Sequence, residues 1–275
     1  MYNINVTAYG INSLNASLAG RTALVTGGSR GIGRGICERL AAGGVLVAVH
    51  YASNDAAAKD TVDTIEAAGG RAFPIRAELG ADGDADTVIQ AVAAGLRART
   101  GQDRLDILVN NAAVADSAGG IDTETPEAFD RLFAVNVRAP FFLIQKALPL
   151  MGDGGRIINI GSGVTRIALP GELAYAMTKA AIATLTRNVA NQVGARGITV
   201  NAVAPGPTRT ERTAVFYDRP EARTMIAAAQ ALERVGTPAD IAEVVAFLAG
   251  PGSGWLTANV IDATGGSYLG PKRLG

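Results

Sequence analysis

The chain has 275 residues and no net charge, because its 25 lysines and arginines equal its 25 aspartates and glutamates. This balance argues against nucleic acid or an acidic membrane as a partner, since both attract an excess of positive charge. With only one cysteine, Cys37, and one histidine, His50, an internal disulfide and a Cys/His metal site are excluded, so no metal is expected.

The composition is typical of one α/β domain built from small side chains. Apolar residues make up 48% of the chain but aromatic residues only 5%, and there are 34 glycines. We assign residues 21–275 to this domain, a length that α/β folds often use. Residues 1–20 are uncharged and lack the basic start and continuous apolar run of a signal peptide, so we interpret them as a polar extension. No apolar run approaches the roughly 18 residues of a membrane span, and a cytoplasmic protein is expected.

From Arg21 onward, short β-branched runs alternate with longer alanine-rich segments of helical periodicity. This alternation is typical of repeated strand–helix–strand units and predicts a parallel sheet. The predicted strands are 22–26, 45–50, 72–77, 105–110, 156–161, 198–204 and 259–262. Helices are predicted near 31–42, 55–68, 84–99, 125–150, 172–195 and 238–249. Asp55 and Asp84 are predicted to cap two of them, and Pro126 suits a first helical position.

Residues 205–238 interrupt this pattern with an irregular stretch rich in arginine. A long insertion after a late strand is often a lid over a site at the carboxyl edge of the sheet, so a lid is predicted at about 206–237. The alternative is a pair of surface helices without a role at the site.

The first predicted strand runs into a glycine loop that precedes a helix. Residues 26–33 read T-G-G-S-R-G-I-G. Glycines let a pyrophosphate approach the backbone, and the free N–H groups at the start of a helix attract negative charge. The spacing differs from G-x-G-x-x-G, because residue 36 is Ile36, and no G-K-[ST] follows. A dinucleotide-binding loop is therefore predicted, with ordinary turn glycines as the alternative.

The second predicted strand ends without the acid that holds the ribose of NAD. No carboxylate occurs before Asp55, whereas Arg30 supplies a cation and Tyr51 and Ser53 supply hydroxyl groups. These groups suit a 2′-phosphate, so NADP(H) is favoured over NAD(H).

Tyr175 and Lys179 are four residues apart on a predicted helix and share one face. A nearby ammonium favours the phenolate, so Lys179 is expected to lower the pKa of Tyr175 and make it a usable acid and base. Alone, the pair is more typical of an amphipathic surface. Ser162 changes this interpretation, because it ends the strand at 156–161, at the edge where α/β sheets bind ligands.

Together these motifs resemble the short-chain dehydrogenase/reductase family over residues 21–268, closest to its 3-oxoacyl carrier-protein reductase branch. The matching positions are Gly27, Gly31 and Gly33 for T-G-x-x-x-G-x-G, 110–113 for N-N-A-G, the tetrad Asn136, Ser162, Tyr175 and Lys179, and 198–201 followed by Pro205 and Gly206. The resemblance implies a single α/β domain with a Rossmann-like, doubly wound, seven-stranded parallel sheet and helices on both faces.

The resemblance also implies the mechanism. Tyr175 would protonate the carbonyl oxygen while NADPH delivers hydride to its carbon, and Ser162 would hydrogen-bond the same oxygen. Lys179 would hold the nicotinamide ribose, Asn136 would position a water in the proton relay, and Thr208 would contact the carboxamide. The cofactor residues implied are Gly27, Ser29, Arg30, Gly31, Ile32, Gly33, Tyr51, Ala52, Ser53, Glu78, Leu79, Asn111, Ala112, Ala113, Tyr175, Lys179, Pro205, Gly206 and Thr208.

Two of these positions depart from the family pattern, and two more bear on the substrate. Ala113 replaces a glycine, and Glu78 replaces an aspartate. Carrier-protein reductases dock their acidic carrier through two arginines, which by the surrounding blocks correspond to Leu143 and Asn191. Neither is basic, which favours a free small-molecule or secondary-metabolite ketone. A pocket is expected from Val164, Thr165, Leu169, Pro170 and 207–232.

Other functions stay open at this point. A carrier could dock through Arg138, Arg187 or the lid arginines, as in a 3-oxoacyl carrier-protein reductase, or the enzyme could oxidise an alcohol. A non-catalytic NADP(H)-sensing regulator would not need the tetrad, and a nucleotide-independent lyase would be expected to lose the glycine loop. Apolar residues on more than one face of the helices at 125–150 and 172–195 predict a homotetramer or homodimer. They are Phe141, Phe142, Leu148, Ile182, Leu185 and Val189.

Overall fold

Seven parallel strands form the centre of the molecule, in the order β3-β2-β1-β4-β5-β6-β7. The computed structural model describes residues 18–115, 119–267 and 269. The strands are β1 (Thr22–Val25), β2 (Leu46–Tyr51), β3 (Arg71–Arg76), β4 (Leu105–Asn110), β5 (Met151–Ile160), β6 (Thr199–Pro205) and β7 (Val260–Ala263). The order reverses between β1 and β4, which opens a crevice at their carboxyl ends. The predicted fold class is confirmed.

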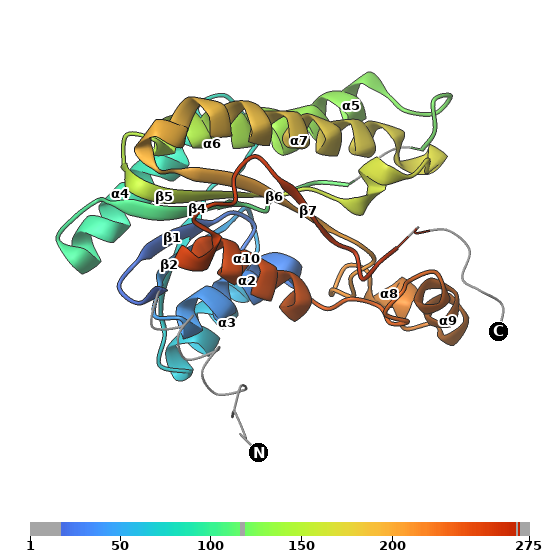
Figure 1. Cartoon of the computed structure of the whole chain (residues 1–275), viewed down its shortest axis with the longest axis horizontal. Helices are drawn as coiled ribbons and strands as arrows, with labels where there is room; N and C mark the ends of the chain where they lie inside the picture. Colours follow the sequence, from blue (N-terminus) through green and yellow to red (C-terminus); the bar gives the residue numbers. More distant parts are fainter. Residues whose placement is uncertain (1–17, 116–118, 268, 270–275) are drawn as a thin grey trace, which may run out of the picture.

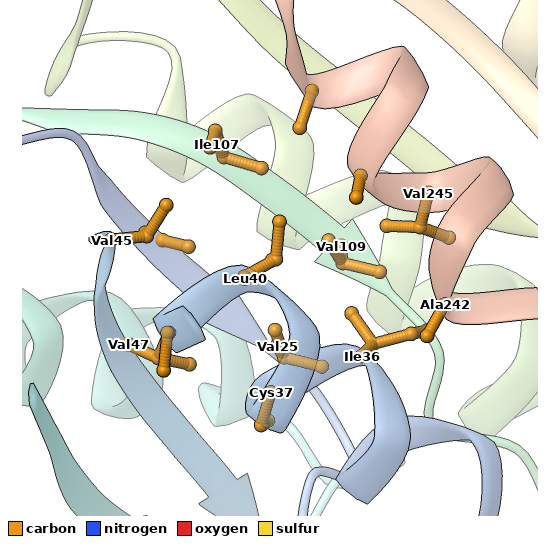
Figure 2. Close-up of a cluster of buried hydrophobic side chains, with 14 of the residues drawn as sticks. Val25, Ile36, Cys37, Leu40, Val45, Val47, Ile107, Val109, Ala242 and Val245 are labelled. Atoms are coloured by element: carbon orange, nitrogen blue, oxygen red, sulfur yellow. The ribbon is translucent and has the colours of Figure 1, made fainter. Parts of the chain in front are cut away.

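Helices cover both faces of the sheet (Figure 1). One layer contains α2 (Gly31–Ala42), α3 (Asp55–Ala67) and α10 (Pro238–Ala249). The other contains α4 (Asp84–Thr100), α5 (Pro126–Phe133), α6 (Ala139–Ala147) and α7 (Leu173–Val193). Small side chains allow this close packing: Figure 2 shows Ile36, Cys37 and Leu40 of α2 against strand valines, with Ala242 of α10 beside them.

The predicted helix at 125–150 is broken into α5, a π-helical turn (Ala134–Arg138) and α6. Pro140 explains part of the break, because it has no N–H to donate to the carbonyl of Asn136 four residues earlier. The next strand also begins sooner than predicted, at Met151. Asn136 lies inside the π turn, a distortion that is often found at functional sites.

Two predicted helix caps are wrong. Asn54, not Asp55, caps α3, since its side chain accepts a hydrogen bond from the N–H of Ala57 at 2.9 Å. Gly83 stands at the N-cap of α4, and the Asp84 carboxylate instead accepts from the N–H of Gly80 at 2.7 Å. Pro126 does begin α5, as predicted.

The ends of the domain also refine the sequence interpretation. Leu18 is fully buried in the core, so the packed domain includes residues that we assigned to the N-terminal extension. Among the described residues, no helix is both long and apolar enough to cross a membrane.

The predicted lid folds as two short helices, α8 (Ala214–Tyr217) and α9 (Pro220–Ala228), which lie beyond one end of the sheet (Figure 1). Its two ends are tied together, because the N–H of Arg209 donates to the carbonyl of Gly236 at 2.8 Å. The segment is therefore a pair of short helices whose two ends are joined, and its role as a lid stays a prediction.

Candidate active site

The glycine loop joins β1 to α2 at the crevice between β1 and β4. A Cβ atom on Gly33 would lie 2.0 Å from the carbonyl oxygen of Gly27, so only glycine fits this position. Gly27 and Gly31 have φ angles of +63° and +56°, in the left-handed region that favours glycine. Gly27, Gly31 and Gly33 therefore put no side chain of their own between the backbone and a pyrophosphate approaching the start of α2.

Asn111 and Thr26 fix the shape of this loop. The Thr26 hydroxyl accepts hydrogen bonds from the N–H groups of Asn111 and Ala112, at 2.9 and 3.0 Å. In return, the Asn111 amide donates to the carbonyls of Thr26 and Gly27, at 2.8 and 3.1 Å. Asn111 was predicted to contact a ribose, but both hydrogen bonds of its amide nitrogen stabilise the glycine loop. Thr26 was not among the predicted site residues, although it begins their motif.

His50 has a larger role than the strand-end position that the sequence suggested. Its Nδ1 accepts from the N–H of Gly27 at 3.2 Å, and its Nε2 lies 3.1 Å from the carbonyl oxygen of Ala77. Burial lowers the pKa of His50 to about 4, so the ring is neutral at neutral pH and can accept the Gly27 hydrogen bond. His50 therefore joins the glycine loop to the end of β3.

Protonation of His50 is expected to destabilise the fold. The pKa of His50 falls from 6.5 in the unfolded chain to about 4 in the folded one. The contribution of neutral His50 to the free energy of unfolding is therefore complete above pH 6.5 and is lost as the pH falls toward 4. The loss amounts to about 3 kcal/mol in the free energy of unfolding. Urea unfolding at several pH values should show a smaller loss for His50→Gln than for the unsubstituted protein. Equal losses would contradict the role of His50.

The end of β2 presents the predicted groups for a 2′-phosphate, with one addition. Arg30 is exposed at the N-cap of α2, and among the described residues its side chain has no hydrogen bond or ion pair. Tyr51, unlike Arg30, interacts with a neighbouring side chain. Partial burial and a hydrogen bond to Asp55 raise the pKa of its hydroxyl. Asp55 in turn pairs with Arg76 at 3.3 Å. Arg76, which the sequence interpretation missed, brings a second cation to this end.

The remaining predicted cofactor residues border the crevice in different ways. Ala52, Ser53 and Glu78 are exposed, while Leu79 is partly buried against the core. On the opposite side, Gly206 packs so closely that a Cβ atom there would lie 2.8 Å from the Cα of Thr264. The Thr208 hydroxyl donates to the carbonyl of Gly206 at 2.9 Å, which holds the turn after β6.

Ser162, Tyr175 and Lys179 converge at the carboxyl end of β5. Ser162 follows this strand, and its hydroxyl lies close enough to that of Tyr175 to lower the pKa of the tyrosine. Lys179 is buried one helical turn after Tyr175, with its Nζ 5.5 Å from the centre of the tyrosine ring and 2.8 Å from the carbonyl oxygen of Ile160. The structure thus brings together three of the four predicted catalytic side chains.

The predicted lowering of the Tyr175 pKa by Lys179 is wrong for the protein alone. Burial raises the pKa of Tyr175, while Arg212 and the hydrogen bond from Ser162 act in the opposite direction and Glu172 adds to the rise. Burial, and then Arg212, lower the pKa of Lys179 to about 8. At neutral pH the site therefore holds a protonated tyrosine beside a charged lysine.

Asn136 links the segment after β4 to α7 through its side-chain amide. Its amide nitrogen donates to the carbonyl of Val114 at 2.8 Å and to the Thr178 hydroxyl at 3.2 Å, and its oxygen accepts from the N–H of Val114 at 2.9 Å. Thr178 donates in turn to the carbonyl of Tyr175 at 2.7 Å. Because both amide hydrogens are used, Asn136 fixes the helical turn that carries Tyr175, and the predicted water stays a prediction.

The charges of Arg212 and Glu172 shift the pKa of Tyr175 in opposite senses, so removing either charge should shift the pH profile of the reaction. Arg212→Gln should raise the pKa of Tyr175 and Lys179, whereas Glu172→Gln should lower that of Tyr175. Since reduction needs the protonated tyrosine, the fall of kcat/KM at high pH should move up for Arg212→Gln and down for Glu172→Gln. Measured pH profiles that shift together, or not at all, would contradict this arrangement.

The structure also describes the residues that were considered for a metal or for docking a carrier protein. Among the described residues, no cluster of three or more His, Cys, Asp or Glu side chains could hold a metal ion. Leu143, placed by sequence at a carrier-docking position, is fully buried, so that position is not on the surface. Arg138 is paired with Asp82 at 2.7 Å and with the carbonyl of Gly80.

Comparisons with known proteins agree with this geometry. A family model described as Enoyl-(Acyl carrier protein) reductase matches residues 27–267. Short-chain dehydrogenase/reductase FrzI from Cladobotryum sp. is 38% identical, covering 91% of this chain and 96% of FrzI. The angucycline C-6 ketoreductase LanV, solved with bound NADP, is 49% identical with a TM-score of 0.88, covering 92% of this chain and 98% of LanV. The promiscuous reductase LugOII, which catalyses keto-reduction at C1 during lugdunomycin biosynthesis, is 53% identical with a TM-score of 0.89, covering 92% and 100%.

The doubly wound sheet, the glycine loop and the Ser162, Tyr175 and Lys179 cluster define a dinucleotide-dependent oxidoreductase. The chain belongs to the short-chain dehydrogenase/reductase family, as the sequence predicted.

Proposed function

We propose that the protein is an NADPH-dependent reductase that converts a free small-molecule ketone of secondary metabolism to a secondary alcohol. The observation that carries this proposal is the convergence of Ser162, Tyr175 and Lys179 at the sheet edge that also bears the glycine loop. The NADP-bound ketoreductase LanV and the keto-reducing LugOII support the same reaction class.

The cofactor NADP(H) fits the groups that the crevice offers. The glycines of the loop leave open the space that a Cβ atom would fill, so a pyrophosphate can approach the backbone there. Arg30 is an exposed cation with no partner among the described residues. Gly27, Gly31 and Gly33 would face the pyrophosphate, Arg30 the 2′-phosphate, and Lys179 and Thr208 the nicotinamide end. When bound, NADPH supplies the hydride.

Tyr175 supplies the proton in this proposal. Because burial raises its pKa, the hydroxyl is protonated at neutral pH and ready to donate to a carbonyl oxygen. Ser162 would donate a second hydrogen bond to that oxygen, and the Lys179 ammonium would stabilise the negative charge left on the phenolate. A protonated tyrosine favours reduction over alcohol oxidation near neutral pH.

Surface charge supports a free substrate over a carrier-bound one. Asn191 is exposed but neutral, Leu143 is buried, and the exposed residue beside it is Phe142. Arg138 is already held by Asp82. No basic pair of the kind expected for an acidic carrier protein is found at these positions.

Turnover assays with the purified protein test this proposal. Loss of NADPH absorbance should accompany reduction of at least one ketone in a panel of free cyclic and aromatic ketones. The carrier-bound alternative predicts that a 3-oxoacyl thioester on a carrier protein is the better substrate. Tight NADPH binding without turnover of any carbonyl compound would favour the non-catalytic regulator.

We further propose a homotetramer or homodimer in the cytoplasm. Phe141 and Phe142 of α6 are exposed by 48% and 39%, and Met177 of α7 by 45%. Exposed apolar side chains of this size are typical of subunit interfaces. A cytoplasmic location agrees with a dinucleotide cofactor kept inside the cell. Sedimentation of the purified protein tests the assembly.

A further inference from the structure

The start of α2 is capped by a residue from the lid. Its N-cap residue, Arg30, makes no side-chain capping bond, and its first turn contains no acidic residue. Instead, the Glu211 carboxylate accepts a hydrogen bond from the N–H of Gly31, the first residue of the helix, at 2.9 Å. A negative charge therefore already occupies the positive end of this helix.

The lid reaches this position through a short, internally bonded turn. The Thr213 hydroxyl donates to the carbonyl of Thr208 at 2.9 Å and accepts from the N–H of Thr210 at 2.8 Å. Thr210 lies beside the glycine loop, since a Cβ atom on Gly31 would be 3.3 Å from its methyl group. The turn thus presents Glu211 directly to the amide of Gly31.

We propose that Glu211 is an internal competitor for the cofactor pyrophosphate, whose carboxylate holds the lid against the glycine loop until the cofactor displaces it. The inference rests on the proposed NADP(H) function. Pyrophosphate needs the same helix start and carries the same sign of charge, so the two anions repel each other at this place. A cavity of about 490 Å³ between α2 and α10 adjoins Gly31 and Glu211 and leaves room for the displaced side chain.

Cofactor titrations of Glu211→Gln test the competition. Loss of the charge should tighten NADPH binding about three- to fivefold, the effect expected for one anion at a helix start. The nucleotide 2′-AMP lacks the pyrophosphate, so its Kd should not change. Glu127→Gln removes an equal charge from the first turn of α5, outside the lid, and should leave both constants unchanged.

Limited trypsin digestion gives a readout that needs no cofactor. Because loss of the charge weakens the contact with Gly31, cleavage at the lid arginines Arg209, Arg212 and Arg223 should be faster in Glu211→Gln than in the unsubstituted protein or Glu127→Gln. Unchanged or weaker NADPH binding, an equal gain for 2′-AMP, or unchanged lid cleavage would each overturn the inference. Absence of NADPH binding by the unsubstituted protein would instead overturn the proposed function.

Discussion

Tyr175→Phe is expected to lower kcat for ketone reduction by about 10²- to 10⁴-fold, the usual contribution of a positioned general acid. The substitution removes one hydroxyl group, the partner of Ser162 at the carboxyl end of β5. The ring still packs above Lys179, so the Kd for NADPH should stay close to that of the unsubstituted protein. Steady-state kinetics and cofactor titration with the same preparation separate the two effects.

Tyr217→Phe is a comparison variant, because it removes a hydroxyl from α8, in the segment expected to line the pocket but outside the Ser162, Tyr175 and Lys179 cluster. It should keep most of the activity. Retention of full rate by Tyr175→Phe would show that another group donates the proton. Equal losses in both variants would point to a general effect on the fold or the lid.

Arg30→Ala should weaken NADPH binding by about 10- to 150-fold and leave NADH binding nearly unchanged. The range corresponds to the roughly 1.5 to 3 kcal/mol of hydrogen bonds to a charged group. Arg30 is exposed and has no partner among the described residues, so its loss should cost the fold little. Fluorescence titration with both cofactors measures the two constants.

Arg71→Ala is a suitable control for Arg30→Ala, since Arg71 is an exposed cation at the opposite end of β3. It should not change either constant. Arg30→Lys should recover part of the NADPH affinity, because it restores the charge without the planar guanidinium. Equal weakening of NADPH and NADH by Arg30→Ala would contradict a 2′-phosphate site there.

The sequence was most informative where chemistry depends on residues that are close along the chain. The glycine loop at 26–33 and the pair Tyr175 and Lys179 are local patterns, and the strand that ends before Ser162 places it at the same edge. Parallel strands share one carboxyl edge, so these motifs were expected to meet, and the structure brings them together.

Features that depend on distant contacts could not be predicted from the sequence. Burial of Tyr175 reverses the expected direction of its pKa shift, and burial depends on the packing of the whole site. The contact of Glu211 with Gly31 joins residues 180 positions apart through a lid whose path no local pattern specifies. The π turn at Asn136 did have a local signal, because Pro140 lies inside the helix predicted at 125–150.

The most direct test of the account follows a labelled hydride. NADPH carrying deuterium at its transferable position should be incubated with the purified protein and the best ketone of the panel. Deuterium is expected on the carbinol carbon of the product, with one NADPH consumed for each alcohol formed and the reaction suppressed in Tyr175→Phe. An alcohol without deuterium, or bound NADPH that reduces no ketone, would contradict this expectation.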